Sequence, residues 1–386
     1  MSINVRQLNV VKNILDKSIF NENIIEILLI KYWDSLPKEY ILLDWINESK
    51  LNYKQLSSNP NSIQLLRKNI KKIDWYNLSK NNKAINILLQ NINKINWDAF
   101  SFNTNSIAIE ILQRNTKRIN WNYLSMNENA IHLLIDNIDY INWDNLLVNP
   151  NAINIIENKL NSETLENIQY DINLLSSNPN AIHILEKYKP YINWMELSKN
   201  PNAIQLIEER IDYENNLVFE DYIDLRIHRK INWQFLSSNP NAIHILENNL
   251  NKIDWQLLSM NENAIHLLEQ NLDKVNWGIL CNNYCAIPIL EKNQDKIDWS
   301  ELSKNDNCNA IQLLQNNLDK INWSNLSENY KAIPILEKHL DKVDWSNLSE
   351  NIRAIPILKK NQDKIDWNRL SKNPSIFKIE KNPYVI

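Results

Sequence analysis

Imidazole groups recur at one position of a repeated motif in this chain. Four of its six histidines, His132, His183, His244 and His266, stand after Ala-Ile and before two aliphatic residues, and Gln205 fills the same place in another copy. Imidazole binds metals and moves protons near neutral pH, but His244 and His266 are a full repeat apart, so a shared metal ion is not expected. We interpret these residues as a polar column that contacts a protein partner; the alternative is a hydrated surface column.

Lysine and arginine form a second column, three residues before a recurring tryptophan. A row of cations of this kind indicates a groove that follows a phosphate backbone. Several of these lysines directly follow an aspartate, as Lys274 follows Asp273, and the whole chain has a net charge of −4. The neighbouring charges offset each other, so nucleic acid is the less favoured partner. The column consists of Lys72, Lys94, Arg118, Lys230, Lys252, Lys274, Lys296, Lys320, Lys342 and Lys364.

Other residue types argue against an enzyme. A single glycine in 386 residues excludes phosphate-binding Gly-rich loops and dinucleotide fingerprints. The three cysteines, Cys281, Cys285 and Cys308, have no histidine or further cysteine pair that completes a zinc set, so we expect structural free thiols. No nucleophile and base stand apart from the repeat, and a residue repeated a dozen times serves packing or capping. We therefore expect no catalytic residue, no cofactor and no metal.

Two insertions interrupt the repeat, near 158–170 and 208–230. Insertions in repeat arrays map to loops on one face, which is often the binding face. The second insertion is acidic and aromatic, which is what a partner-docking segment requires; the alternative is a solvated loop or an extra helix. Its candidate partner-binding residues are Tyr213, Glu214, Phe219, Glu220, Asp221 and Tyr222.

One unit carries all these positions: a Trp, then a Leu three places on, an Asn six places on and an Ile ten places on. The commonest step between units is 22 residues, as from Trp255 to Trp277, and Tyr53 and Ile172 replace the Trp in two copies. A fixed short period over most of a chain indicates a repeat array. The Trp position is held by Trp75, Trp97, Trp121, Trp143, Trp194, Trp233, Trp255, Trp277, Trp299, Trp323, Trp345 and Trp367.

Each unit predicts two short helices. Asp254 is a good N-cap for a first helix that begins at Trp255, and Ile253 with Leu258 forms a hydrophobic staple across its start. The recurring Asn, often followed by Pro, predicts the N-cap of a second helix; an Asn ladder that binds a ligand is the alternative. Pro288, Pro334 and Pro356 fall inside that second helix, so in these copies we expect a later or irregular start. The Trp residues are expected to pack in the core.

The sequence therefore predicts an all-α fold, an α-solenoid of about fourteen two-helix repeats over residues 53–373. The alternative is an α/β solenoid like the leucine-rich repeats, whose Leu-x-Leu signature this unit lacks. Residues 1–52 predict a helical N-terminal cap, and 374–386 a C-terminal cap or tail. The polar N-terminus lacks the apolar stretch of a signal peptide, and the longest apolar run, 24–30, is too short to span a bilayer.

The unit, read as INW, LSSNPNAI and LLExN in residues 231–233, 236–243 and 267–271, resembles the Trp- and Asn-rich repeats of giant DNA viruses of the mimivirus type. The resemblance implies a viral protein in the cytoplasm of an infected host cell or in the virion, and it implies no biochemical activity. We expect a non-enzymatic scaffold for a host or viral protein. The alternatives are a self-assembling virion component that stacks end to end and a single-stranded nucleic-acid-binding solenoid.

Overall fold

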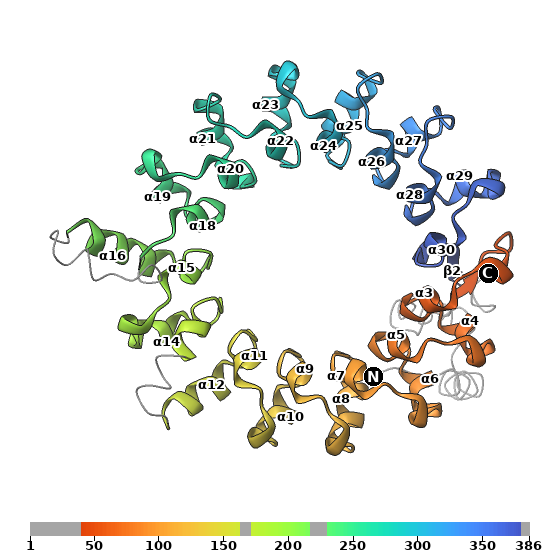
Figure 1. Ribbon diagram of the computed structural model, residues 1–386, viewed down its shortest axis with the longest axis horizontal. Helices are drawn as coiled ribbons and strands as arrows, with labels where there is room; N and C mark the ends of the chain where they lie inside the picture. The colour runs from red at the N-terminus through yellow and green to blue at the C-terminus, as the bar shows by residue number, and fades with distance from the viewer. Residues whose placement is uncertain (1–39, 163–170, 217–229, 380–386) are drawn as a thin grey trace, which may run out of the picture.

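The computed structural model describes residues 40–162, 171–216 and 230–379, and it shows an all-α solenoid that closes into a ring (Figure 1). The first helix of each repeat lies on the inside of the ring and the second on the outside. The inner helices are α3 (Tyr53–Ser58), α5 (Trp75–Lys80), α7 (Trp97–Ser101), α9 (Trp121–Ser125), α11 (Trp143–Leu147), α15 (Trp194–Leu197), α18 (Trp233–Ser238), α20 (Trp255–Leu258), α22 (Trp277–Leu280), α24 (Trp299–Leu302), α26 (Trp323–Glu328), α28 (Trp345–Glu350) and α30 (Trp367–Leu370). Residues 171–175 are helical as well and belong to the inner helix of the repeat between α11 and α15.

The outer helices differ more in length. They are α4 (Ile63–Lys68), α6 (Ile85–Gln90), α8 (Ser106–Gln113), α10 (Ile131–Ile135), α12 (Ile153–Leu160), α14 (Ile182–Lys187), α16 (Ile204–Asn215), α19 (Ile243–Glu247), α21 (Ile265–Gln270), α23 (Ile287–Lys292), α25 (Cys308–Gln315), α27 (Ile333–Leu336) and α29 (Ile355–Lys360). In most repeats a 3-10 turn such as Ile70–Lys72 leads from the outer helix back to the next inner helix.

The inner helices begin as the sequence predicts. The Asp254 carboxylate accepts a hydrogen bond from the backbone N–H of Leu257, and Ile253 and Leu258 of the staple are both buried. Aspartate or asparagine caps the other inner helices in the same way, for example Asn96 through the N–H of Ala99. Each inner helix is therefore fixed by local hydrogen bonds as well as by packing.

The start of the outer helix differs from the prediction in two respects. The N-cap residue is usually alanine, as at Ala84, and the recurring Asn instead accepts from the N–H two residues on, as Asn81 does from Lys83. The prolines do not delay the helices: α23 and α29 begin at the same repeat position as α21, with Pro288 and Pro356 in their first turn. A first-turn N–H has no intrahelical partner, so proline costs no hydrogen bond there.

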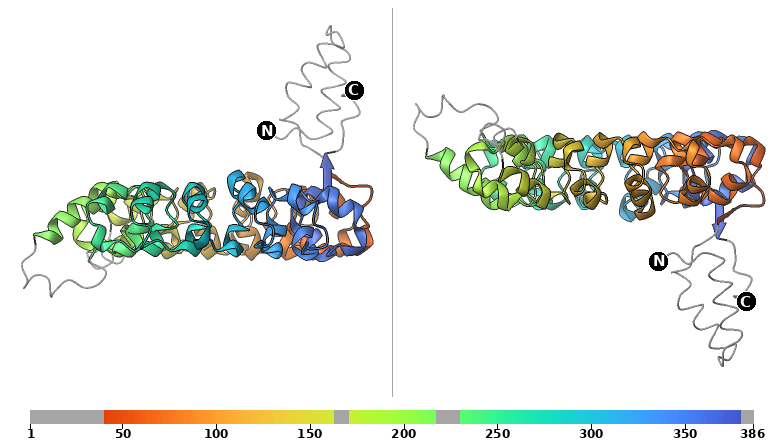
Figure 2. Two further views of the ribbon diagram at one scale, coloured as in Figure 1. Left: turned by 90° about the horizontal axis from the view of Figure 1, so that it is seen from above. Right: turned by 90° about the horizontal axis from the view of Figure 1, so that it is seen from below.

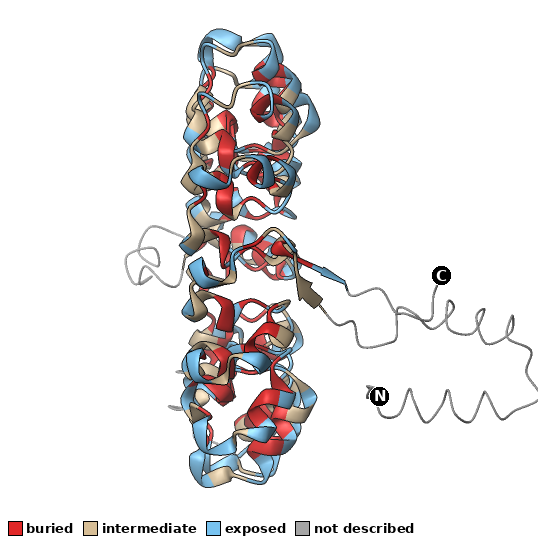
Figure 3. Ribbon diagram, turned by 90° about the vertical axis from the view of Figure 1, so that its right-hand side faces the viewer, coloured by how far each residue is buried: buried red, intermediate tan, exposed pale blue. Residues whose placement is uncertain are grey.

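The core lies in the wall of the ring and is formed by residues of both the inner and the outer helices; buried segments recur along the whole height of the edge-on ring (Figure 3). It consists of the repeated Leu of the inner helix, two aliphatic residues of the outer helix and the Ala before it, such as Leu258, Leu267, Leu268 and Ala264. The Trp side chains flank this core as partly buried groups, with Trp194 the one buried Trp in the described chain. The expectation that Trp packs in the core is therefore correct only in part.

The two ends of the described chain meet. Strand β1 (Tyr40–Leu42) pairs antiparallel with β2 (Phe377–Ile379), with Ile41 opposite Lys378. The sheet stands on one face of the flat ring, and β2 leaves that face in the edge-on views (Figure 2). Residues 48–52 form the turn and cap that precede the first inner helix, α3, and they follow α30 in space as they would follow a complete repeat. One repeat is thus split between the two ends of the chain.

Several sequence predictions fall outside the described residues. These are residues 1–39 of the expected helical cap, 380–386 of the tail and 163–170 of the first insertion. In the second insertion, residues 208–215 extend α16, whereas 217–229, with Phe219, Glu220, Asp221 and Tyr222, lie outside.

Candidate interaction surfaces of the ring

The recurring Asn forms a hydrogen-bonded circuit around the whole ring. Each Asn side chain is buried, its Oδ1 accepts from the N–H two residues on, and its Nδ2 donates to backbone carbonyls of the preceding repeat. Buried amides must be satisfied, and here they join the repeats. The fourteen members are Asn59, Asn81, Asn103, Asn127, Asn149, Asn178, Asn200, Asn239, Asn261, Asn283, Asn305, Asn329, Asn351 and Asn373.

The junction between the two chain ends uses the same kinds of hydrogen bond as the internal junctions. Asn59 Nδ2 donates to the carbonyl oxygens of Ser371 and Asn373 at 3.2 and 3.3 Å, as Asn261 does to those of Ser237 and Asn239 at 3.2 and 3.1 Å. The N–H of Asn52 donates to Ser371 Oγ at 2.8 Å, which repeats the bond from an inner-helix cap to a serine of the preceding repeat. The ring is therefore closed by a regular repeat contact.

Serine usually occupies the position two residues before the recurring Asn, and Cys281 replaces it in one repeat. The serine hydroxyl donates to the Trp carbonyl and accepts from the next cap N–H, as Ser259 does with Trp255 and Asn276. Cys281 is fully buried, and burial raises the pKa of its thiol to about 11, although the nearby Asp298 N–H acts in the opposite direction. This sulfur is a packing group. Cys285 and Cys308 are exposed.

The basic column lies over the aromatic column. The ammonium of Lys274 lies 4.9 Å from the ring centroid of Trp255, one repeat earlier, and the same contact joins Lys252 to Trp233 and Lys364 to Trp345. At the closure, Lys50 lies 5.0 Å from the Trp367 ring. These are cation–π contacts. The sequence pattern suggested that aspartate neighbours offset the lysines, but among the described residues only Lys296 pairs with such a neighbour, Asp295 at 3.6 Å.

The histidine column lies on the outer helices, where it pairs with glutamates of the preceding repeat. His183 is 3.2 Å from Glu157, His244 is 2.8 Å from Glu208, and His266 contacts Glu247. His132 and Gln205 are exposed on α10 and α16. The structure places the predicted column on one solvent-facing surface; it does not test whether a partner binds there.

The extended end of α16 holds the chain at the second insertion. Glu214 Oε1 accepts from Arg210 Nε and from the N–H of Ile231, each at 3.0 Å, and both side chains are nearly buried. The Arg210 guanidinium lies 5.1 Å from the Trp194 ring centroid and 4.8 Å from that of Tyr213, whose side chain is 53% exposed. Glu214 therefore joins the two ends of the insertion, whereas Tyr213 faces solvent.

The sequence reasoning did not identify the inner surface of the ring. On most inner helices the Leu and Ser three and four places after the Trp are buried, so the positions one, two and five places after it point away from the core; Ala99, two places after Trp97, is the exception and is buried. These three positions, called here the inner columns, face the centre of the ring because their helices form its inner row (Figure 1). They are also where the repeats differ most from one another.

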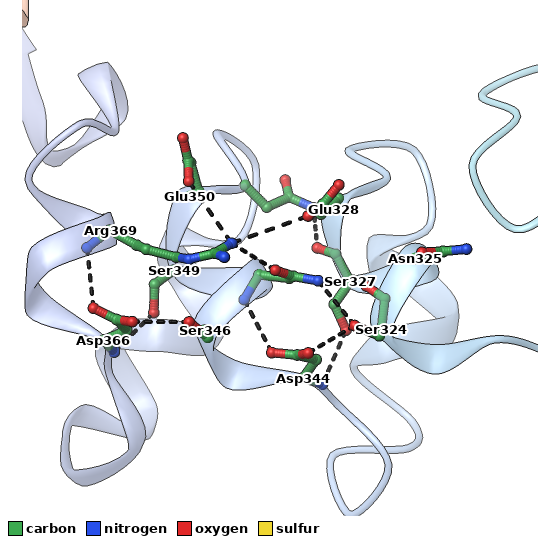
Figure 4. A network of polar contacts seen from close by, with 12 residues as sticks. Ser324, Asn325, Ser327, Glu328, Asp344, Ser346, Ser349, Glu350, Asp366 and Arg369 are labelled. Atoms are coloured by element: carbon green, nitrogen blue, oxygen red, sulfur yellow. Dashed lines mark hydrogen bonds and ion pairs between the residues drawn. The ribbon is translucent and has the colours of Figure 1, made fainter.

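One sector of the inner columns is polar and internally paired (Figure 4). Arg369 on α30 donates to Asn347 Oδ1 at 2.6 Å and lies 3.9 Å from Glu350 and 4.0 Å from Glu328. Ser346 donates to Asp366 at 2.8 Å; the Arg369 backbone N–H, as the largest influence, holds the pKa of the Asp366 carboxyl below its usual value. The charges of this sector, over α24 to α30, largely satisfy each other.

A second sector of the inner columns is apolar, and only α3 separates it from the first sector around the ring (Figure 1). Large apolar side chains are exposed on four successive inner helices, α5, α7, α9 and α11, and we call them the apolar arc: Tyr76, Phe102, Tyr123, Met126 and Val148, exposed by 50, 37, 38, 46 and 44%. Phe102 and Tyr123 stack across two repeats with ring centroids 4.3 Å apart. Lys80 donates to the Tyr76 hydroxyl at 2.8 Å and lies 5.8 Å from the Phe102 ring.

The described residues contain no group of three or more side chains placed to hold a metal ion. None of the described helices is long and apolar enough to cross a membrane. No protein-family model, curated protein or solved structure matches this chain.

Proposed function

We propose that this protein is a non-enzymatic, ring-shaped scaffold that binds a protein partner. The supporting observation is that recurring and variable positions of the repeat have different roles. Of the positions that recur in nearly every copy, Asn, Ser and Leu are used inside the ring wall, as around Asn261, and the Trp–Lys pair flanks it, as at Trp255. The exposed positions vary from repeat to repeat, and variable side chains on a regular frame are how repeat proteins recognise partners.

The resemblance to giant-virus repeats supplies the setting of this proposal. It suggests a viral protein, located in the cytoplasm of the infected host cell or in the virion, with a host or viral protein as the partner. The outer surface with His183, His244 and His266 and the insertion that follows α16 remain proposed contacts, together with the inner columns.

The two alternatives, a virion component that stacks end to end and a solenoid that binds single-stranded nucleic acid, receive less support. End-to-end stacking of an open solenoid requires two free ends, and here the first and last repeats are bonded to each other through Asn59 and Asn373. Binding of nucleic acid through the basic column requires lysines available to phosphates, and most of these lysines lie over Trp rings, as Lys320 does over Trp299 at 4.7 Å. The inner columns carry equal numbers of charges of each sign: Lys54, Lys80, Lys199, Lys304, Arg369 and Lys372 against Asp98, Asp144, Glu196, Glu301, Glu328 and Glu350.

An affinity capture from infected-cell lysate, identified by mass spectrometry and repeated with purified candidates, tests the proposal. Three forms of the full chain would be compared: the natural protein, a His183→Ser/His244→Ser/His266→Ser variant and a variant with residues 217–229 replaced by a short Ser-Gly linker. A discrete partner that binds the purified ring in a defined stoichiometry supports a scaffold, and its loss in one variant locates the contact. Capture of capsid proteins or of the chain itself alone, indifferent to both variants, would turn the function to virion architecture.

A further inference from the structure

We propose that the apolar arc on the inner surface of the ring is the docking site for a basic amphipathic helix of the partner, an inference that rests on the proposed scaffold function. The arc is the largest group of exposed apolar side chains that follow one another on neighbouring helices in the described chain, and it has no counterpart in the sector of α24 to α30.

The area of the arc indicates a small contact. Aromatic side chains bury roughly 150–250 Å² each, and on that scale the exposed fractions of these five correspond to roughly 320–540 Å² of surface. A stable protein dimer buries about 800 Å² on each partner. The arc is therefore too small for a second copy of this chain and suits a single segment.

The dimensions of the ring also require a narrow occupant. Inner helices that pack roughly 8–10 Å apart in a ring of fourteen repeats, one for each Asn of the buried circuit, give a circle about 36–45 Å across between helix axes. After the width of the helices is removed, the opening is roughly 25–35 Å. A helix with its side chains, about 10–12 Å wide, enters this space, whereas another ring of the same width does not.

The spacing of the arc selects a helix over an extended strand. Side chains seven residues apart on one helical face are about 10.5 Å apart, close to the roughly 8–10 Å between neighbouring inner helices. Side chains on one face of a strand repeat every ~6.8 Å, which is shorter than the spacing between neighbouring inner helices, so they do not stay in register with the arc. Methionine and aromatic side chains, here Met126 and Tyr123, are also the groups that adapt to the apolar face of a helix.

The charges around the arc indicate that the helix is basic. Among the six carboxylates of the inner columns, Asp98 and Asp144 are the two with no ion pair to any described residue, and both belong to helices of the arc. Asp98 accepts a hydrogen bond from Asn120 at 2.8 Å, and Asp144 is exposed. Lys80, a cation of the inner columns on α5, is engaged with Tyr76 and Phe102. Basic residues of a partner helix would form ion pairs with these two carboxylates.

Fluorescence anisotropy with three labelled peptides tests the proposal on the full chain. The probes are an 18-residue Leu/Lys peptide patterned as an amphipathic helix, a peptide of the same composition in scrambled order, and a Leu/Glu peptide with the helical pattern. The Leu/Lys helix is expected to bind at least about tenfold more tightly than either of the others, a difference worth about 1.4 kcal/mol. Equal binding of the scrambled or the acidic peptide overturns the proposal.

Matched variants locate the site. Phe102→Gln/Met126→Gln is expected to weaken the Leu/Lys helix at least about tenfold, whereas Met260→Gln, at the same repeat position outside the arc and 58% exposed, leaves binding unchanged. Asp98→Asn/Asp144→Asn should weaken binding of the Leu/Lys helix and make that binding less dependent on salt concentration. All the residues replaced in these three variants are exposed, so the unfolding curves of the variants are expected to match that of the natural protein.

Two outcomes with these variants overturn the inference while leaving the scaffold function standing, and a third identifies a different occupant. One is an equal loss of peptide binding in Met260→Gln. The other is a partner from the lysate capture that binds Phe102→Gln/Met126→Gln as tightly as the natural ring. A concentration-dependent dimer in analytical ultracentrifugation that the double variant abolishes would make a second copy the occupant and overturn it as well.

Discussion

Replacing one Asn of the buried circuit tests whether the ring is closed in solution. Asn59 lies at the junction of the chain ends and Asn261 at an internal junction, and both are buried with matching bonds. In each case alanine removes one accepted bond from the N–H two residues on and the donated bonds to carbonyls of the preceding repeat, which are two at Asn261 and three at Asn59, where the third goes to Lys372 at 3.4 Å. The two substitutions are therefore chemically equivalent if the ring is closed.

The size of the expected loss in the free energy of unfolding follows from the hydrogen bonds that each substitution removes. A protein hydrogen bond contributes about 0.5–1.5 kcal/mol net, and the cost rises when a buried partner is left unsatisfied. We expect Asn59→Ala and Asn261→Ala each to lower the free energy of unfolding by about 2–4 kcal/mol. Asn248→Ala, which removes an exposed side chain that bonds only within its own turn, is the control and should change it by less than about 0.5 kcal/mol.

Urea unfolding followed by far-ultraviolet circular dichroism and by Trp fluorescence measures the three changes. Equal losses at Asn59 and Asn261 are expected. A loss at Asn261 with none at Asn59 would refute closure, because in an open array water would already occupy the bonds of Asn59. Coincidence of the two probes also shows whether the ring unfolds as one cooperative unit.

Three further outcomes follow from individual contacts. Native protein should present two thiols to a disulfide reagent at pH 8, Cys285 and Cys308, and three in urea, since burial keeps Cys281 protonated. Because the pKa of Cys281 is raised from 9.0 to about 11 by folding, its contribution to stability is complete below pH 9 and falls by roughly 1.4 kcal/mol per pH unit up to about pH 11; Cys281→Ser, measured against the natural protein, should remove that slope. Trp255→Ala should cost about 2–3 kcal/mol in urea unfolding, below the value for a fully buried Trp, and Lys274→Ala about 0.5–1 kcal/mol through the lost cation–π contact.

The local features could be predicted because they depend on residues close in sequence. The cap at Asp254 and the staple of Ile253 and Leu258 involve neighbours within five positions, and the period of the apolar residues fixes which faces are buried. The outer helix was less well predicted because an Asn-Pro-Asn turn and an N-cap have the same composition. Only the geometry shows that Asn81 bonds two residues on and into the preceding repeat.

Ring closure could not be predicted from the repeat alone. Closure depends on a rotation of about 26° between successive repeats, and small differences in side-chain packing set that rotation. A signal was nevertheless present: Lys50, Leu51 and Asn52 occupy the positions that precede an inner helix, while the last repeat stops soon after Asn373. Two complementary partial repeats at opposite ends of a chain are what a closed array requires.

The unequal sectors of the inner surface limit what the ring can recognise. If the ring encircled a rod with regular symmetry, such as a nucleic-acid duplex, the inner columns would repeat around it, as the Asn and Ser columns do. Instead, Tyr76 to Val148 form an apolar sector, and Glu301 to Lys372 form a sector whose charges satisfy each other. A surface that is apolar in one sector and internally neutralised in another binds a partner at one part of its circumference. The inner surface is therefore better suited to one segment held against one wall than to a symmetrical object passing through the centre.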